Sequence, residues 1–343
     1  MLCFVGLGLD QSVSLVALKV LQNCDYIYYE SYTSPVVNTK IEDEIGKSVE
    51  RVKRSFVEDG HKILELARYS NVALLCSGDP LVATTHQELR TRATGKGIET
   101  RVIHGSSVLT AVVGELGLHA YNVGRIVTMT RDPMQYTAYN TIFKNLLQGL
   151  HTIVLLEWDE ASEFFLSPDS AVKSLLEAEK DIRNGVLNND TLMLVASRLG
   201  TEKAAISATT FGEIGTVEFG KPPHTLMIPG RLHFTEREAL GALLKRGADS
   251  LRDNSGALAD LSNLMVKKYS QKTLNALGRA KKAATLARRD SSLADVFENV
   301  ECYTQDARRF LNEGKKELAV LSIGYAEGLL DSLRFTKQLE FEW

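Results

Sequence analysis

Long apolar runs are absent from this 343-residue sequence. A membrane-spanning helix needs about 20 consecutive apolar residues, and no stretch approaches that length. A secretion signal would place basic residues ahead of its apolar core, but residues 2–6 already form an apolar segment at the start of the chain. We therefore expect a cytoplasmic protein that does not bind membranes.

Cysteine is also scarce. The four cysteines, Cys3, Cys24, Cys76 and Cys302, include no C-x-x-C pair, and the seven histidines lack the spacing of metal ligands. Disulfide frameworks and structural zinc sites rely on such pairs. Cys3 and Cys76 lie in apolar runs, which favours buried free thiols. We expect no disulfide and no bound metal.

What the sequence contains is typical of a multidomain α/β protein. Apolar residues make up 44% and charged residues 24%, as in ordinary globular proteins, and the length predicts two or three domains. Up to about residue 105, apolar strands alternate with amphipathic helices, the pattern of a parallel sheet. Strands are predicted at residues 2–6, 26–30, 72–75 and 100–103. A second α/β set has predicted strands at 126–130, 152–156, 191–196 and 225–228, and a predicted helix at 162–184.

The C-terminal part has a different pattern. Residues 248–256 indicate a linker or helix break, after which apolar residues recur at spacings of three and four. The predicted helices span residues 257–289, 292–312 (capped by Ser292 and stopped by Gly314) and 315–337, and would form a helical hairpin or three-helix bundle. The predicted domains are residues 1–110, 111–247 and 257–343.

Three turns that follow predicted strands are rich in Gly, Ser and Asp: residues 6–10, 77–80 and 104–107. In open α/β sheets, turns at the carboxyl ends of strands form the sites for small molecules. Gln11 occupies the place of the third glycine of a dinucleotide-binding motif, so that motif is not present. Asp79 would either bind a ligand or cap the helix that follows, and the sequence leaves both open.

Five segments in this order resemble archaeal diphthine synthases, of the tetrapyrrole-methylase class of methyltransferases that use S-adenosylmethionine (SAM). They are FVGLGL (residues 4–9), SGDPLVATTH (77–86), VIHGSSV (102–108), GLHT (149–152) and KPPHTLMIPG (221–230). The resemblance covers residues 1 to about 240, and its second segment is specific to diphthine synthases. It implies an α/β fold of two domains with a ligand cleft between them, and a homodimer. The all-α domain that follows here extends beyond the usual end of the family and is similar to a small archaeal helical domain of unknown function.

The resemblance also implies a SAM site without metal, which would release S-adenosylhomocysteine. Matched motif by motif, the contacts are Leu9, Asp79, Val82, Ser107, Val108, Leu156, Leu199 and His224. His224 would be a general base or, more in keeping with its place between prolines and an apolar strand, a structural residue. No catalytic base is assigned, since the acceptor amine can lose its proton to water. The loop at 131–135 is shorter than in the family, which would alter docking of a protein substrate.

The substrate that the resemblance implies is the aminocarboxypropyl-histidine of translation elongation factor two, methylated repeatedly on its amine in diphthamide biosynthesis. One alternative is a tetrapyrrole methylase acting on a cobalamin precursor, which an arginine-lined cleft would favour. Another is a translation-associated binding protein that acts through its basic helical tail. Eight basic residues and no acidic ones lie between Lys267 and Arg289, which fits an RNA or acidic partner or, alternatively, a solvated helix face.

Overall fold

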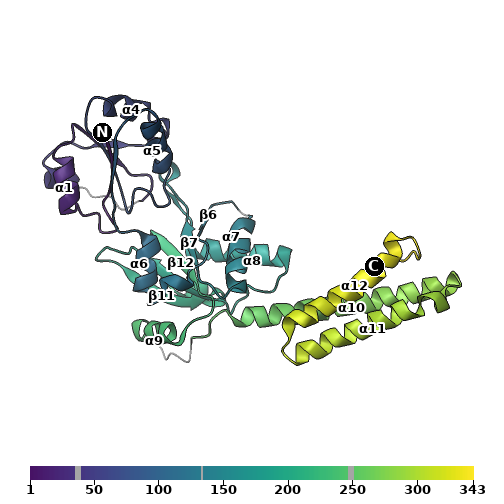
Figure 1. The fold of residues 1–343 in the computed structure, drawn as a ribbon. Coiled ribbons are helices and arrows are strands. Elements are labelled where there is room, and N and C mark those ends of the chain that lie inside the picture. The colour runs from purple at the N-terminus through teal and green to yellow at the C-terminus, as the bar shows by residue number, and fades with distance from the viewer. Residues whose placement is uncertain (35–39, 133, 246–250) are drawn as a thin grey trace. The chain divides into compact units, whose positions relative to one another are not determined.

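The computed structural model describes residues 1–34, 40–132, 134–245 and 251–343, without the side chains of residues 257–261 and 290. Residues 1–182 and 187–254 form one compact unit, and residues 183–186 with 255–343 form a second. The first unit contains two five-stranded sheets, and the second is helical (Figure 1).

The first sheet is entirely parallel, with the order β3-β2-β4-β1-β5. Its strands are β1 (Leu2–Gly6), β2 (Tyr26–Glu30), β3 (Glu50–Val52), β4 (Val72–Cys76) and β5 (Thr100–Ile103). Every residue of β1 and β4 is buried, as the continuous apolar runs of their sequences predict for central parallel strands. All the predicted strands of this sheet are present, and the three-residue edge strand β3 was not predicted.

Helices cover both faces of this sheet. One face packs against α1 (Leu15–Leu21) and α2 (Ile41–Ile45), and the other against α3 (Arg54–Asp59), α4 (His61–Ala67) and α5 (His86–Gly95). Figure 1 shows α1 and α5 on opposite sides of the sheet. Alternate residues of one strand divide between the two faces: Leu2 and Phe4 join one core, Cys3 and Val5 the other.

The second sheet is mixed, with the order β11-β10-β12-β7-β6. Only β6 and β7 pair in parallel. The strands are β6 (Val127–Met129), β7 (Thr152–Leu156), β10 (Leu192–Ser197), β11 (Ala205–Thr210) and β12 (His224–Ile228). One face packs against α6 (Val108–Glu115) and α9 (Phe234–Leu243), while α7 (Tyr136–Leu147) contacts β6 and β7. Short 3-10 helices occupy Ala120–Asn122, Glu160–Ser162 and Phe211–Thr216.

The predicted helix at 162–184 begins too early. α8 spans Pro168–Ile182, and the residues before it form a small hairpin of β8 (Trp158–Asp159) and β9 (Phe164–Phe165). The Trp158 and Phe165 rings stack with centroids 4.1 Å apart. This aromatic pair favours the hairpin, and proline is well suited to the first turn of a helix, so the helix starts at Pro168.

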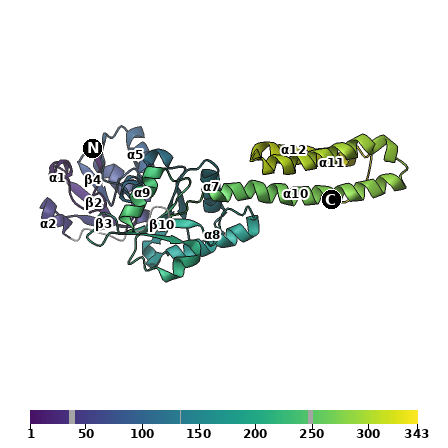
Figure 2. The ribbon, with the colours of Figure 1, turned by 90° about the horizontal axis from the view of Figure 1, so that it is seen from below.

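The helical unit contains α10 (Gly256–Leu286), α11 (Asp290–Asn312) and α12 (Lys316–Phe335), each in contact with the other two (Figure 2). It is a three-helix bundle with an apolar core of its own that includes Leu277, Val300 and Leu330. Ser292 is not the cap of α11, because the helix already begins at Asp290 and the Ser292 hydroxyl donates to the Arg289 carbonyl. Of the predicted linker, residues 248–250 lie outside the described residues, as do the side chains of Leu258 and Leu261.

The expected free thiols are present. Cys3, Cys24 and Cys76 are buried, Cys302 is exposed, and none forms a disulfide. In the described ranges, no helix has the length and apolarity needed to cross a membrane.

Candidate functional site: a cavity at the carboxyl edge of the first sheet

The three small-residue turns of the sequence meet at one edge of the first sheet. The Gly8 amide donates to the Gly78 carbonyl at 3.1 Å, and the Gly78 amide donates back to the Gly8 carbonyl at 2.9 Å. A Cβ atom added to Gly105 would collide with the Gly78 carbonyl oxygen. Glycine is therefore required where the turns approach so closely, because any side chain would separate them.

Asp79 ties two of these turns together. One carboxylate oxygen accepts from the Leu81 amide at 2.9 Å, and the other lies 2.7 Å from Nδ1 of His104. Because α5 begins only at His86, Asp79 caps the local turn rather than a helix. The carboxylate is 7% exposed and the imidazole is 69% exposed, so this hydrogen-bonded pair lies at the boundary between the protein and solvent.

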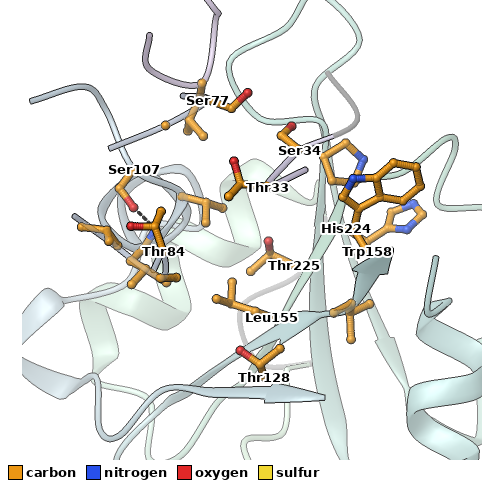
Figure 3. Close-up of a pocket in the computed structure, with 18 of the residues that line it drawn as sticks. Thr33, Ser34, Ser77, Thr84, Ser107, Thr128, Leu155, Trp158, His224 and Thr225 are labelled. Atoms are coloured by element: carbon orange, nitrogen blue, oxygen red, sulfur yellow. Dashed lines mark hydrogen bonds between the residues drawn. The ribbon is translucent and has the colours of Figure 1, made fainter. Parts of the chain in front are cut away.

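A cavity of about 500 Å³ opens beside these turns (Figure 3). On the side of the first sheet its walls come from the residues that follow β1, β2, β4 and β5. On the side of the second sheet they come from β6, β7, β10 and β12 and from the residues that follow β7 and β10. The volume lies within the range of small-molecule sites. All eight residues selected from the sequence line it: Leu9, Asp79, Val82, Ser107, Val108, Leu156, Leu199 and His224.

Hydroxyl groups form much of the polar lining. They come from the segments after β2, β4 and β5 of the first sheet and from β6 and β12 of the second, as Figure 3 shows for Thr33, Ser34, Ser77, Thr84, Ser107, Thr128 and Thr225. Hydroxyls both donate and accept, and they bind polar ligands without the desolvation cost of a buried charge. The Ser107 hydroxyl also accepts from the Leu109 amide at 3.2 Å, so this side chain begins α6 while it faces the cavity.

Five ionised side chains line the cavity: Arg54, Asp79, Glu157, Asp159 and Arg198. Of these, only Asp79 was selected from the sequence. Two of the missed residues, Glu157 and Arg198, could have been found because they are sequence neighbours of the selected residues Leu156 and Leu199. A site built to hold the many carboxylates of a tetrapyrrole would need more than two arginines.

Arg131, in the short loop after β6, forms ion pairs with Glu157 and Asp159, the two carboxylates at the start of the β8–β9 hairpin. Its guanidinium lies 3.1 Å from Glu157 and 2.6 Å from Asp159, and rests over the Phe164 ring with 4.4 Å to the centroid. The loop at 131–135 thus fixes the hairpin that borders the cavity, although Pro133 within it lies outside the described residues.

Behind the cavity lies a buried network around Glu30 and His86, both fully buried. The Glu30 carboxylate accepts from the Tyr32 and Thr33 amides at 3.1 Å, which shapes the loop that places Thr33 in the cavity wall. Burial raises the pKa of Glu30 to about 7 and lowers the pKa of His86 to about 4. His86 donates from Nδ1 to the Pro80 carbonyl at 2.9 Å and accepts from the Tyr32 hydroxyl at 3.3 Å, which fits a neutral ring.

His224 is the first residue of β12, and its imidazole is hydrogen-bonded to the main chain of the preceding loop. Its Nε2 atom lies 3.3 Å from the Phe219 carbonyl and 3.2 Å from the Gly220 carbonyl. Because carbonyl oxygens only accept, Nε2 carries the proton and Nδ1 is the acceptor. Burial lowers the pKa of His224, which favours this neutral form. Among the residues that the structure describes, no group of three or more His, Cys, Asp or Glu side chains is arranged to hold a metal.

Comparison with known proteins identifies two families along the chain. Residues 1–215 match the tetrapyrrole (corrin/porphyrin) methylases, and residues 268–339 match a family of unknown function, DUF357. The chain is 38% identical over 248 residues to a diphthine synthase of Methanothermobacter thermautotrophicus, covering 70% of this chain and 94% of that protein. It is 39% identical over 270 residues to a diphthine synthase of Methanosarcina mazei, covering 74% and 99%. A crystal structure of a diphthine synthase superposes with a TM-score of 0.65 at 32% identity, covering 72% of this chain and 97% of that one.

Proposed function

Because the chain belongs to the tetrapyrrole methylase family and, within it, to the diphthine synthases, we propose that it methylates the aminocarboxypropyl-histidine of translation elongation factor two, with SAM as methyl donor. The chain is a methyltransferase. The proposed use of SAM is supported by one observation: all eight residues matched to SAM contacts, from Leu9 to His224, line one cavity. The proposed site of action is the cytoplasm.

The cavity suits this cofactor in size and polarity. A side chain at Gly105 would collide with the Gly78 carbonyl oxygen, so the turns carry no side chain where they approach each other. A ligand at this edge therefore meets backbone amides and carbonyls. Hydroxyls of Ser77 and Ser107 and the Asp79 carboxylate supply polar contacts. SAM supplies a methyl group on a positively charged sulfur, for which carbonyl dipoles and a carboxylate are the favourable surroundings.

The protein's role in methyl transfer is to align the amine with the methyl group and the sulfur, and to exclude water. The amine lone pair forms the new C–N bond as the C–S bond breaks, so the amine must be uncharged and in line when it attacks. One proton leaves before each transfer, and the third methyl gives a permanently charged trimethylammonium. His224 donates from Nε2 to carbonyl oxygens, so it holds the start of β12, and we assign no general base.

The proposed domain roles follow the sequence. Residues 1–110 and 111–247 would form the two halves of the cofactor and substrate cleft, and residues 257–343 would be a separate module. We further propose that the enzyme acts as a homodimer. The helical module is proposed to recruit an acidic partner, protein or RNA, through the eight basic residues between Lys267 and Arg289, six in α10 and two just after it.

Half of those basic side chains already have partners within the helical unit. Lys272 and Lys281 form ion pairs with Glu327 and Glu301, while Arg279 and Arg289 donate to main-chain carbonyls near the C-terminus. Four cations of the set would serve a partner: Lys267, Lys268, Lys282 and Arg288.

A methyl-transfer assay tests the central proposal. Elongation factor two that carries the aminocarboxypropyl group should gain successive methyl groups on the one modified histidine, read by mass spectrometry. Factor without that group should gain none. Equal methylation of both would reject the proposed substrate. Calorimetry with S-adenosylhomocysteine and a chelator should show about one site per chain, and silent titrations would reject the cofactor.

A further inference from the structure

Arg198 differs from the other ionised side chains of the cavity in its pairing. Arg54 pairs with Glu58, and Asp79 is hydrogen-bonded to His104. The remaining two carboxylates, Glu157 and Asp159, pair with Arg131. Within the described part of the chain, Arg198 forms no ion pair. The cavity wall therefore contains a cation whose charge no described residue neutralises.

The position of Arg198 is defined by its backbone. It follows β10 with a φ of 50°, a left-handed conformation that is uncommon for a residue with a side chain and that clusters at functional sites. Its amide donates to the Pro223 carbonyl at 3.0 Å and its Nη1 to the Pro222 carbonyl at 3.1 Å. These two bonds fix the arginine against the loop that leads into β12.

Much of the guanidinium is left for a ligand. Of its five N–H donors, only Nη1 has a hydrogen bond to a described residue, and Nε is buried without a partner. A second cavity residue has the same deficit, because Nε1 of Trp158 is also buried without a partner. Buried donors without acceptors are costly, so such donors in a cavity wall indicate that a ligand supplies the acceptors.

We propose that Arg198 binds the carboxylate of an α-amino-acid group in the cavity. A planar guanidinium with free donors matches a carboxylate better than any other common anion except phosphate, and the proposed reaction involves no phosphate group. This inference rests on the proposed function, in which two molecules carry such a carboxylate. One is the methionyl end of the cofactor, and the other is the aminocarboxypropyl group of the acceptor.

The test compares Arg198→Gln with Arg198→Lys, which keeps the charge. Arg183→Gln is the matched control, because Arg183 is an exposed arginine outside the cavity with a similar φ of 61°. Calorimetry measures binding of S-adenosylhomocysteine and of 5′-methylthioadenosine, which lacks the amino-acid end. Steady-state methyl transfer measures the KM for modified elongation factor two. Circular dichroism and the melting temperature establish that each variant is folded.

If Arg198 binds the cofactor carboxylate, Arg198→Gln weakens S-adenosylhomocysteine about 10- to 100-fold and leaves methylthioadenosine unchanged. If it binds the acceptor, S-adenosylhomocysteine is unaffected and the KM for the protein rises by a similar factor. In either case Arg198→Lys recovers part of the loss. Unchanged binding and KM in a folded Arg198→Gln protein would overturn the inference and leave the proposed function intact. Failure of the wild-type protein to bind either ligand would instead reject the proposed function.

Discussion

The imidazole Nδ1 of His104 lies 2.7 Å from Oδ2 of Asp79, and this contact joins the turn after β5 to the turn after β4. The second Asp79 oxygen holds the Leu81 amide in the same turn. The carboxylate thus fixes the cavity wall on which Val82 lies. A residue selected as a ligand contact also organises the site around itself.

Replacement of Asp79 by Asn should weaken S-adenosylhomocysteine about tenfold. Leu81 and His104 contact different oxygens of Asp79, and asparagine keeps only one of the two, so the wild-type geometry loses one of these contacts. His104→Gln should have a smaller effect, and the double variant should lose less than the sum, because the two residues act through one contact. Calorimetry measures the affinities, and His61→Gln is a control at an exposed histidine outside the cavity. Additive losses would contradict the coupling.

Val82→Trp should abolish cofactor binding by filling the cavity. The indole is far larger than the isopropyl group, and Val82 is a wall residue of a cavity of only about 500 Å³. Val16→Trp, at a residue that is 55% exposed and outside this cavity, should bind as the wild type does. Circular dichroism checks the fold of both. Normal affinity in a folded Val82→Trp protein would mean that the cofactor binds elsewhere.

Glu30 and His86 should make opposite contributions to the pH dependence of stability. The pKa of Glu30 is raised to about 7 in the folded protein. Its titration therefore leaves the free energy of unfolding unchanged below the pKa of the unfolded state, and lowers it progressively as pH rises from that value to 7. The pKa of His86 is lowered to about 4, so stability falls as pH drops from 6.5 towards 4. Each effect amounts to roughly 3 kcal/mol at full extent, and the two oppose each other in the wild type.

Glu30→Gln removes only the first contribution. The free energy of unfolding of this variant, measured in urea from pH 4.5 to 7.5, should rise with pH by up to about 3 kcal/mol more steeply than that of the wild type. At low pH the variant should be about as stable as the wild type, because the protonated carboxyl and the amide have the same shape and each keeps an oxygen that accepts from the Tyr32 and Thr33 amides. Parallel pH profiles for the two proteins would show that Glu30 does not titrate in this range.

A fragment of residues 1–255 should fold and bind S-adenosylhomocysteine like the full chain, because no cavity residue lies beyond Thr225. A fragment of residues 1–253, which keeps Asp253 and its contacts with Leu232 and Arg237, should be less stable by about 1–3 kcal/mol. It lacks Asn254, whose side chain accepts from the Leu192 amide and donates to the Leu192 and Pro229 carbonyls. Urea titration of both fragments, and of Asn254→Ala in the longer one, measures this. Equal stabilities would contradict the assigned role of Asn254.

Eight of the residues that line the cavity were predictable from the sequence, and their mutual contacts were not. Apolar runs bounded by Gly, Ser and Asp locate β1, β4 and β5 and the turns after them, because these preferences act between neighbours in the sequence. The eight selected residues came from motif resemblance, and the cavity contains them all. No local sequence pattern shows that Arg198 lacks an ion pair among the described residues. That depends on tertiary contacts, because Arg131 and His104 contact the carboxylates of the cavity.

The sequence by itself determined the alternation of strands and helices, the change to helical repeats near residue 255 and the glycine turns, because each depends on residue type and short spacing. Tertiary structure decided the rest. The polar edge strand β11 exists because β10 offers it hydrogen bonds, and the β8–β9 hairpin takes the place of only the first residues of the predicted helix at 162–184, because Trp158 stacks on Phe165. Likewise, Asp79 binds His104 only because parallel strands bring their carboxyl ends to one edge, so residues far apart in sequence meet there.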